Sequence, residues 1–276
     1  MEIALFSDFP VLAGAFIKSM LVSALQLIAF MGVFVLVGFL IHHMEIKRNA
    51  WLRNSVGNKG IYATAWIGVP VHEIGHAVMC WAFGHQVVQI KLVQFGAPDG
   101  TMGYVNHTYD PTNLFHRIGL FFIGIAPIIM GIAVITGTLY FTLPDTFEKW
   151  TGAVQTSNGV GDIGGTSWLL VSSLFSASNL TDPFFYLFLV IGISVASHMS
   201  LSQSDIIGAK SGLVSIYIIL VILNLLLLSG TGGDMRIKEL FLNDYNVFTL
   251  SISVIAILFS GLASGIAFLL YRVKGR

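Results

Sequence analysis

Residues 61–84 read IYATAWIGVPVHEIGHAVMCWAFG, an apolar run that carries His72, Glu73 and His76 in its middle. A helix needs about 20 mostly apolar residues to cross a bilayer, and this run is long enough. Ionisable side chains inside such a run are unfavourable away from water, so they indicate a functional site. The run therefore predicts a membrane helix that contains a functional site.

The composition of the whole chain is typical of a membrane protein. Of its 276 residues, 55% are hydrophobic and only 10% are charged, and the mean hydropathy is +0.82. These values exclude an ordinary soluble enzyme, because so apolar a chain could not cover its surface with polar groups. The 14 basic and 14 acidic residues cancel, which gives no indication of nucleic acid as a partner. We therefore expect the lipid bilayer as the surroundings.

Six apolar runs are candidates for membrane helices. A further apolar segment, 168–177, has about half the required length and suits an interfacial or re-entrant helix. Basic residues do not decide the orientation, because they are shared equally between the two sides. We predict one all-α, multi-pass domain over residues 1–276 in a bacterial or archaeal cell membrane, with its first apolar segment retained. The predicted spans are approximately 17–41, 61–84, 116–142, 184–200, 209–229 and 246–271.

Two connections between the runs have a pattern of their own. Residues 86–95 partly alternate polar with apolar side chains, 96–100 consist of turn residues, and 101–105 follow as a second short strand. This pattern predicts a β-hairpin. Residues 143–167 contain five glycines together with Ser, Thr and Asp, which is typical of a mobile loop. Neither connection is long enough for an additional folded domain.

The polar residues of the 61–84 run follow the HExxH pattern of zinc hydrolases. Residues four apart share one face of a helix, so the imidazoles of His72 and His76 can reach one metal ion. The carboxylate of Glu73 can then accept a proton from zinc-bound water. The alternatives are that these residues only pack helices together, or that the pattern arose by chance. We predict His72 and His76 as metal ligands and Glu73 as the catalytic base.

A zinc ion needs a third protein ligand, because two imidazoles and a water leave its usual shell of four incomplete. Asp205 lies at the junction of two late spans and is the predicted third ligand. The alternative is that Asp205 caps the helix that follows it. The role of His198, seven residues earlier, is left open between orienting a ligand or substrate and lying at the membrane edge.

Other residues fit the third position less well. Ala82 stands where a metzincin has its third histidine, and His85 would project from the opposite face of the helix. Glu148 and Glu239 are the only later glutamates, and both lie in polar loops without the pattern of gluzincins. Cys80, the only cysteine, is left open between facing the site and serving as a small apolar residue.

These features together resemble the site-2 protease family of intramembrane metalloproteases. The resemblance covers about 61–132 and 184–210, and it consists of the HExxH run, the hairpin, a span with Gly124-Ile125-Ala126-Pro127, and the late aspartate. The chain differs from the family at the aspartate, which Ser204 precedes in place of leucine. The PDZ insert of the family is absent.

The resemblance implies a cofactor and an activity. It implies one Zn²⁺ per chain, bound by His72, His76 and Asp205, with Glu73 activating zinc-bound water. The implied activity is that of an endopeptidase that cleaves membrane-embedded or membrane-anchored protein segments. Such a substrate must unwind before cleavage, because a helix hides its carbonyls, and the hairpin offers either an edge for the extended segment or only a lid.

Two other functions stay open from the sequence. The chain could bind zinc for transport or regulation without proteolysis, or it could be a relative of the protease that has lost activity. A transport pathway would repeat ionisable residues along several spans, whereas here they are concentrated in one place. This concentration favours a single fixed site.

Overall fold

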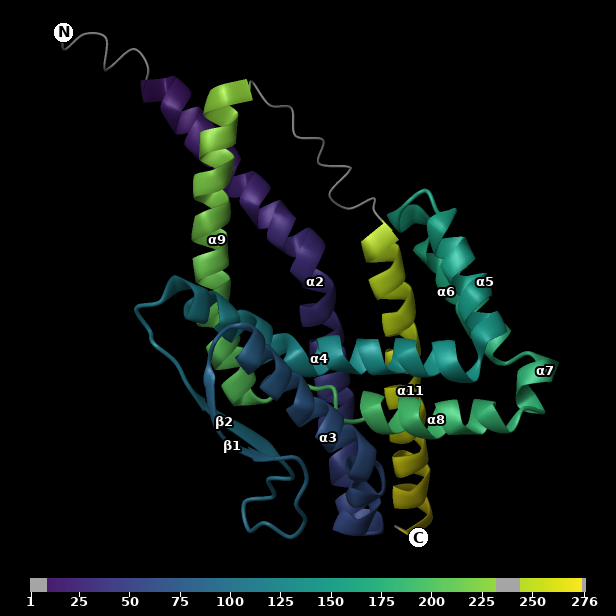
Figure 1. The fold of residues 1–276 in the computed structure, drawn as a ribbon. Helices are drawn as coiled ribbons and strands as arrows, with labels where there is room; N and C mark the ends of the chain where they lie inside the picture. The colour runs from purple at the N-terminus through teal and green to yellow at the C-terminus, as the bar shows by residue number, and fades with distance from the viewer. Residues whose placement is uncertain (1–8, 232–243, 275–276) are drawn as a thin grey trace, which may run out of the picture.

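A computed structural model describes residues 9–231 and 244–274 of the chain, which are helical apart from one hairpin and short connections (Figure 1). The elements are α2 (Phe9–Ser55), α3 (Asn58–Ala82), β1 (Gln86–Lys91), β2 (Tyr104–Thr108), α4 (Leu114–Thr142), α5 (Pro144–Gln155), the 3₁₀ helix η1 (Val160–Asp162), α6 (Ile163–Leu174), α7 (Ala177–Leu180), α8 (Pro183–Ala196), α9 (Gln203–Thr231) and α11 (Asp244–Lys274).

Four of the described helices, α2, α4, α9 and α11, are long and apolar enough to cross a membrane. This agrees with the predicted all-α membrane class, but it does not establish six spans. Helix α3 has the required length, yet its two histidines and glutamate make it less apolar. Helix α8 has 14 residues, so it is only about 21 Å long, shorter than the roughly 30 Å hydrocarbon core.

The long helices do not form a parallel bundle. In Figure 1, α9 and α11 run upright and α2 runs obliquely, whereas α4 and α8 run across the view. Helix α4 packs against α3, α8 and α9, and it is the most deeply buried of the four long apolar helices. Its continuous apolarity therefore reflects burial inside the protein. The largest fully buried side chains of the core are Trp150, Phe121, Phe185, Phe188 and Phe259.

The predicted hairpin is present. Strand β1 pairs antiparallel with β2, with an irregularity between Val87 and Gln89, and β2 begins at Tyr104, three residues later than predicted. The connecting segment needs glycine, because Gly96 and Gly100 both have φ of 77°, a conformation that other residues rarely adopt.

The prediction of a mobile loop over 143–167 is wrong, because α5 and the start of α6 occupy most of it. Trp150 and Val154 lie one turn apart on α5 and are both buried, so this helix has an apolar face on the core. The Trp150 Nε1–H donates a hydrogen bond of 2.9 Å to Ser251 Oγ. Most of the predicted short helix at 168–177 lies in α6, which ends at Leu174 after 12 residues.

Candidate metal centre

The two predicted histidine ligands lie next to each other on α3. The Nε2 atoms of His72 and His76 are 3.1 Å apart, as expected for residues four apart on one helical face. Gly75 faces α4, where an added Cβ would lie 3.0 Å from the carbonyl oxygen of Ala126. The absence of a side chain at Gly75 therefore lets α3 approach α4 closely.

Backbone carbonyls orient both rings. The Nδ1–H of His72 donates to the carbonyl oxygen of His198 at 2.7 Å, and the Nδ1–H of His76 donates to that of Ile123 at 2.8 Å. A carbonyl oxygen can only accept, so each neutral ring carries its proton on Nδ1 and a lone pair on Nε2. Two lone pairs that face each other cannot form a hydrogen bond. The arrangement therefore fits a cation shared between His72 and His76.

Pro127 explains why a carbonyl inside a helix is available to His76. In an α-helix the N–H of residue 127 would bond to the carbonyl oxygen of Ile123, but proline has no N–H. Pro127 lies within α4, and the carbonyl of Ile123 binds His76 instead. Partners of this kind hold ligand rings in place and fix their tautomer.

The Pro127→Ala variant is expected to bind zinc more weakly, by up to the roughly 10–100-fold that the loss of such a partner costs. The new N–H would compete with His76 for the Ile123 carbonyl oxygen. Calorimetric titration with Zn²⁺ of the metal-free protein, in a Cys80→Ser background so that the cysteine contributes no ligand, measures the change. The control is Pro144→Ala at the start of α5, which should leave the affinity unchanged. An unchanged affinity in Pro127→Ala would refute this role.

Asp205 completes the group with one carboxylate oxygen. Its Oδ1 lies 3.5 Å from His76 Nε2, and the ligand atoms of His72, His76 and Asp205 all lie within 4.8 Å of one another. Its Oδ2 accepts from the Ser202 N–H at 2.8 Å, while Ser202 Oγ accepts from the Asp205 N–H at 3.2 Å. This reciprocal pair is a capping box at the start of α9. One oxygen of Asp205 thus takes part in the capping box of α9, and the other faces His76, where it could help to hold a metal ion.

Close packing of α4 against α9 brings Asp205 to the histidines. An added Cβ at Gly124 would lie 2.5 Å from the carbonyl oxygen of Asp205 and 2.7 Å from Ala209 Cβ. Only glycine fits this contact without displacement. The Gly124 and Pro127 pair noticed in the sequence therefore has two uses, because Gly124 admits α9 and Pro127 frees a carbonyl for His76.

Glu73 is buried beside the histidines and borders two cavities. An added Cβ at Gly103 would lie 2.8 Å from Glu73 Oε1, so the segment before β2 runs directly past the carboxylate. We call the cavity of about 440 Å³ on this side the hairpin cavity. Its lining includes His72, Glu73, His76, Asp205 and the β2 residues Tyr104, Val105, Asn106 and His107.

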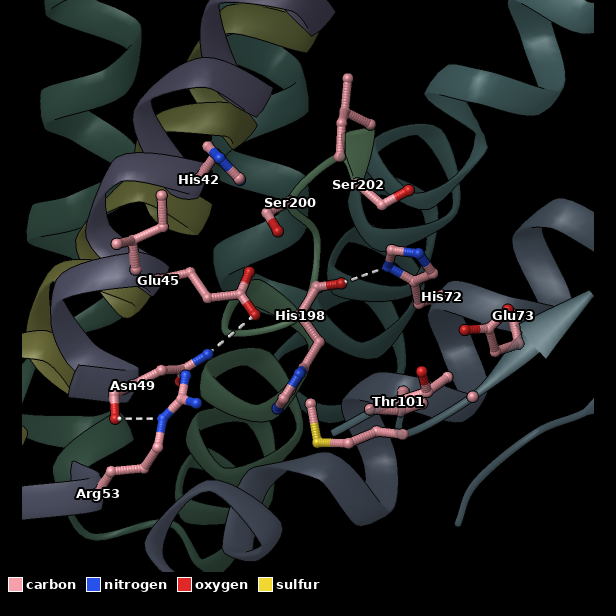
Figure 2. Close-up of a pocket in the computed structure, with 15 residues that line it drawn as sticks. His42, Glu45, Asn49, Arg53, His72, Glu73, Thr101, His198, Ser200 and Ser202 are labelled. Carbon is pink, nitrogen blue, oxygen red and sulfur yellow. Dashed lines mark hydrogen bonds between the residues drawn. The ribbon is translucent and has the colours of Figure 1, made fainter. Parts of the chain in front are cut away.

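The second cavity, which we call the α2 cavity, has a volume of about 380 Å³ and lies between α2 and the histidines. Figure 2 shows that α2 contributes a row of polar side chains to it, with His72 and His198 on the other side. The two cavities share five lining residues: His72, Glu73, Thr101, Gly103 and Ser202. The row on α2 consists of His42, Glu45, Asn49 and Arg53.

The structure also places the residues whose roles the sequence leaves open. His198 is buried; its carbonyl orients His72, and its ring Nε2 lies 3.0 Å from Thr64 Oγ1. This favours the ligand-orienting interpretation over a position at the membrane edge. Glu148 is exposed on α5, and Glu239 lies outside the described residues.

A second group of side chains that could hold a metal ion was not predicted from the sequence. Cys80, His85 and His107 offer ligand atoms that all lie within 4.8 Å of one another. Burial lowers the pKa of His85 and of His107 below the usual value for imidazole. Strand β2 brings His107 back beside the end of α3. The distance of His107 from His85 along the sequence gave no indication that the two side chains meet.

No protein-family model, curated protein or solved structure matches this chain. Its function is therefore inferred from the geometry of the site.

Proposed function

We propose that the chain is a zinc-dependent intramembrane endopeptidase of the site-2 protease type, which cleaves membrane-embedded or membrane-anchored protein segments. The observation that carries this proposal is the pair of Nε2 lone pairs, 3.1 Å apart, on His72 and His76. They lie beside the Asp205 carboxylate and the buried Glu73.

The donor set suits zinc better than the other common divalent ions. Two imidazole nitrogens and one carboxylate oxygen match catalytic zinc sites, whereas magnesium and calcium prefer oxygen ligands alone. We assign His72, His76 and Asp205 as its protein ligands. When bound, zinc polarises the scissile carbonyl and lowers the pKa of water at its open position.

Glu73 is the group that moves the proton. Its carboxylate is buried at the boundary of both cavities and follows His72 in the chain. It takes a proton from the attacking water as the water oxygen bonds to the scissile carbonyl carbon. The same carboxyl then gives the proton to the leaving amine as the C–N bond breaks. The carboxylate of Glu73 is thereby regenerated.

The hairpin supplies an edge for the substrate. Residues 104–107 all line the hairpin cavity, although successive side chains of a strand point to opposite faces. An unbroken run of lining residues therefore indicates that the edge of β2 borders the cavity. In the described chain β1 is the only strand paired with β2, so an unwound substrate can add to the other edge beside Glu73.

The α2 cavity provides a polar route for the water that hydrolysis consumes. Its side chains lie about one turn apart along one face of α2, where Asn49 donates to Glu45 Oε1 at 3.4 Å. The side chain of Arg53 donates to the Asn49 carbonyl oxygen at 3.3 Å. Because the cavity ends at His72 and Glu73, water that enters along α2 arrives beside the proposed base.

The proposal is tested with protein reconstituted in lipid vesicles together with a membrane-anchored model substrate. We expect cleavage to stop when a chelator removes the metal and to return when Zn²⁺ is added. Cleavage that continues in metal-free protein would refute a zinc-dependent reaction. A chain that binds Zn²⁺ tightly but cleaves no membrane segment would instead be a zinc-binding protein without proteolytic activity.

A further inference from the structure

We propose that the chain holds a second metal ion, of the zinc type, between Cys80, His85 and His107. This site lies where the end of α3 meets the hairpin. It is separate from the ligand group of His72, His76 and Asp205, with which it shares no residue.

The ring of His85 is oriented in the same way as the rings of the first site. Its Nε2–H donates to the carbonyl oxygen of His116 at 2.9 Å, so its Nδ1 carries a lone pair. That Nδ1 lies 3.0 Å from Nδ1 of His107. A backbone carbonyl behind a histidine ring, with the opposite nitrogen free, is the usual arrangement of a metal ligand.

This carbonyl lies on the same face of α4 as the carbonyl that accepts from His76. The carbonyls of His116 and Ile123, two turns apart on α4, accept from His85 and His76 respectively. An added Cβ at Gly119, between them, would lie 3.2 Å from His85 Nε2 and would collide with Phe83 Cβ. Glycine therefore lets α4 pack against the end of α3 and bring its carbonyl to His85.

Cys80 gives the group its chemical preference. Its side chain is fully buried, and its sulfur and one ring nitrogen of each histidine all lie within 4.8 Å of one another. One thiolate and two imidazoles form a donor set for zinc or a transition metal and are unsuited to magnesium or calcium. The fourth position is left for water. Of the three residues, His107 also lines the hairpin cavity, so this cavity gives access to the group.

A metal at this position would fasten the hairpin to the helix. Cys80 lies on α3, His85 in the turn after it, and His107 on β2. A two-stranded hairpin is only marginally stable by itself, and this one borders the hairpin cavity. The second ion therefore acts as a structural clamp that holds β2 in place.

The competing explanation is a simple hydrogen bond from His107 Nδ1–H to His85 Nδ1, and one spectroscopic experiment separates the two. Full-length protein in lipid nanodiscs is freed of metal and titrated with Co²⁺. Cys80 is the only cysteine of the chain, so a thiolate-to-cobalt absorption band in the near ultraviolet reports this site alone. We expect the band to saturate at one equivalent per chain for this site.

The variants give the experiment its controls. The band should persist in the His72→Ala/His76→Ala double variant, vanish in Cys80→Ser, and need at least tenfold more Co²⁺ in His107→Ala. The matched control His43→Ala, on an exposed side chain of α2, should titrate like the wild type. The absence of the band in the folded wild-type protein at saturating Co²⁺ would overturn the proposal. An unchanged titration in both His85→Ala and His107→Ala would do the same. Neither outcome depends on whether the chain is a protease.

Discussion

The Glu73→Gln variant is expected to cleave its substrate roughly 10²–10⁴-fold more slowly than the wild-type protein, the usual contribution of a positioned general base. Glutamine has almost the same shape as glutamate, but its amide cannot accept the proton of the attacking water. Metal content and helical structure should stay unchanged, because the proposed ligands are His72, His76 and Asp205. Cleavage of the membrane-anchored substrate under single-turnover conditions, together with metal analysis of the same sample, measures both quantities.

The matched control for this variant is Glu148→Gln. Glu148 is exposed on α5, so the same chemical change there should leave both cleavage and metal content at the wild-type level. If Glu73→Gln cleaves at the wild-type rate, Glu73 is not the base. If it loses metal as well as activity, the residue supports the metal site instead of moving a proton.

The second large effect is expected at Asp205. The Asp205→Asn variant should bind Zn²⁺ at the first site more than about 100-fold more weakly. Loss of a group that only hydrogen-bonds to a metal ligand already weakens binding about 10–100-fold, and Asp205 is itself a proposed ligand. The helix start should be little affected, since the asparagine carbonyl oxygen can still accept from the Ser202 N–H. Asp205→Ala should lose this cap as well, and with it about 1 kcal/mol of stability. Competition with a chelator in a Cys80→Ser background measures the affinity of the first site.

Asp182→Asn provides the control for this substitution. Asp182 caps α8 by accepting from the Phe184 N–H at 2.9 Å and belongs to neither metal-binding group. Its substitution by asparagine should leave zinc affinity unchanged. Wild-type affinity in Asp205→Asn would show that the aspartate only caps α9, and the third ligand would have to be sought elsewhere.

The local parts of the site could be predicted because they depend on residues close together in the chain. His72 and His76 meet because one helical turn separates them, and the polar and apolar pattern of 86–105 was enough for the hairpin. The mobile loop predicted for 143–167 failed for a related reason. Its glycines indicated flexibility, but buried Trp150 and Val154 stabilise α5 through contacts with the distant core.

The centre as a whole could not be predicted in the same way, because its remaining contacts join distant segments. His72 meets the carbonyl of His198 across 126 residues, and His76 meets that of Ile123 across 47. Such contacts depend on how closely helices pack, as at Gly124 against the start of α9. Sequence reasoning grouped Asp205 with His72 and His76, but only the structure showed how its two oxygens divide between His76 and the capping box.

The sequence by itself determined the apolar character of the chain, the helix with two histidines on one face, and the hairpin that follows, because hydrophobicity and helical period act within a few turns. Only the tertiary structure decided which carbonyls turn the imidazoles, which carboxylate reaches them, and that Cys80 joins His85 and His107 in a second group. Those features arise where α3, α4, α9 and the hairpin pack together, and packing is a property of the folded chain rather than of any one segment.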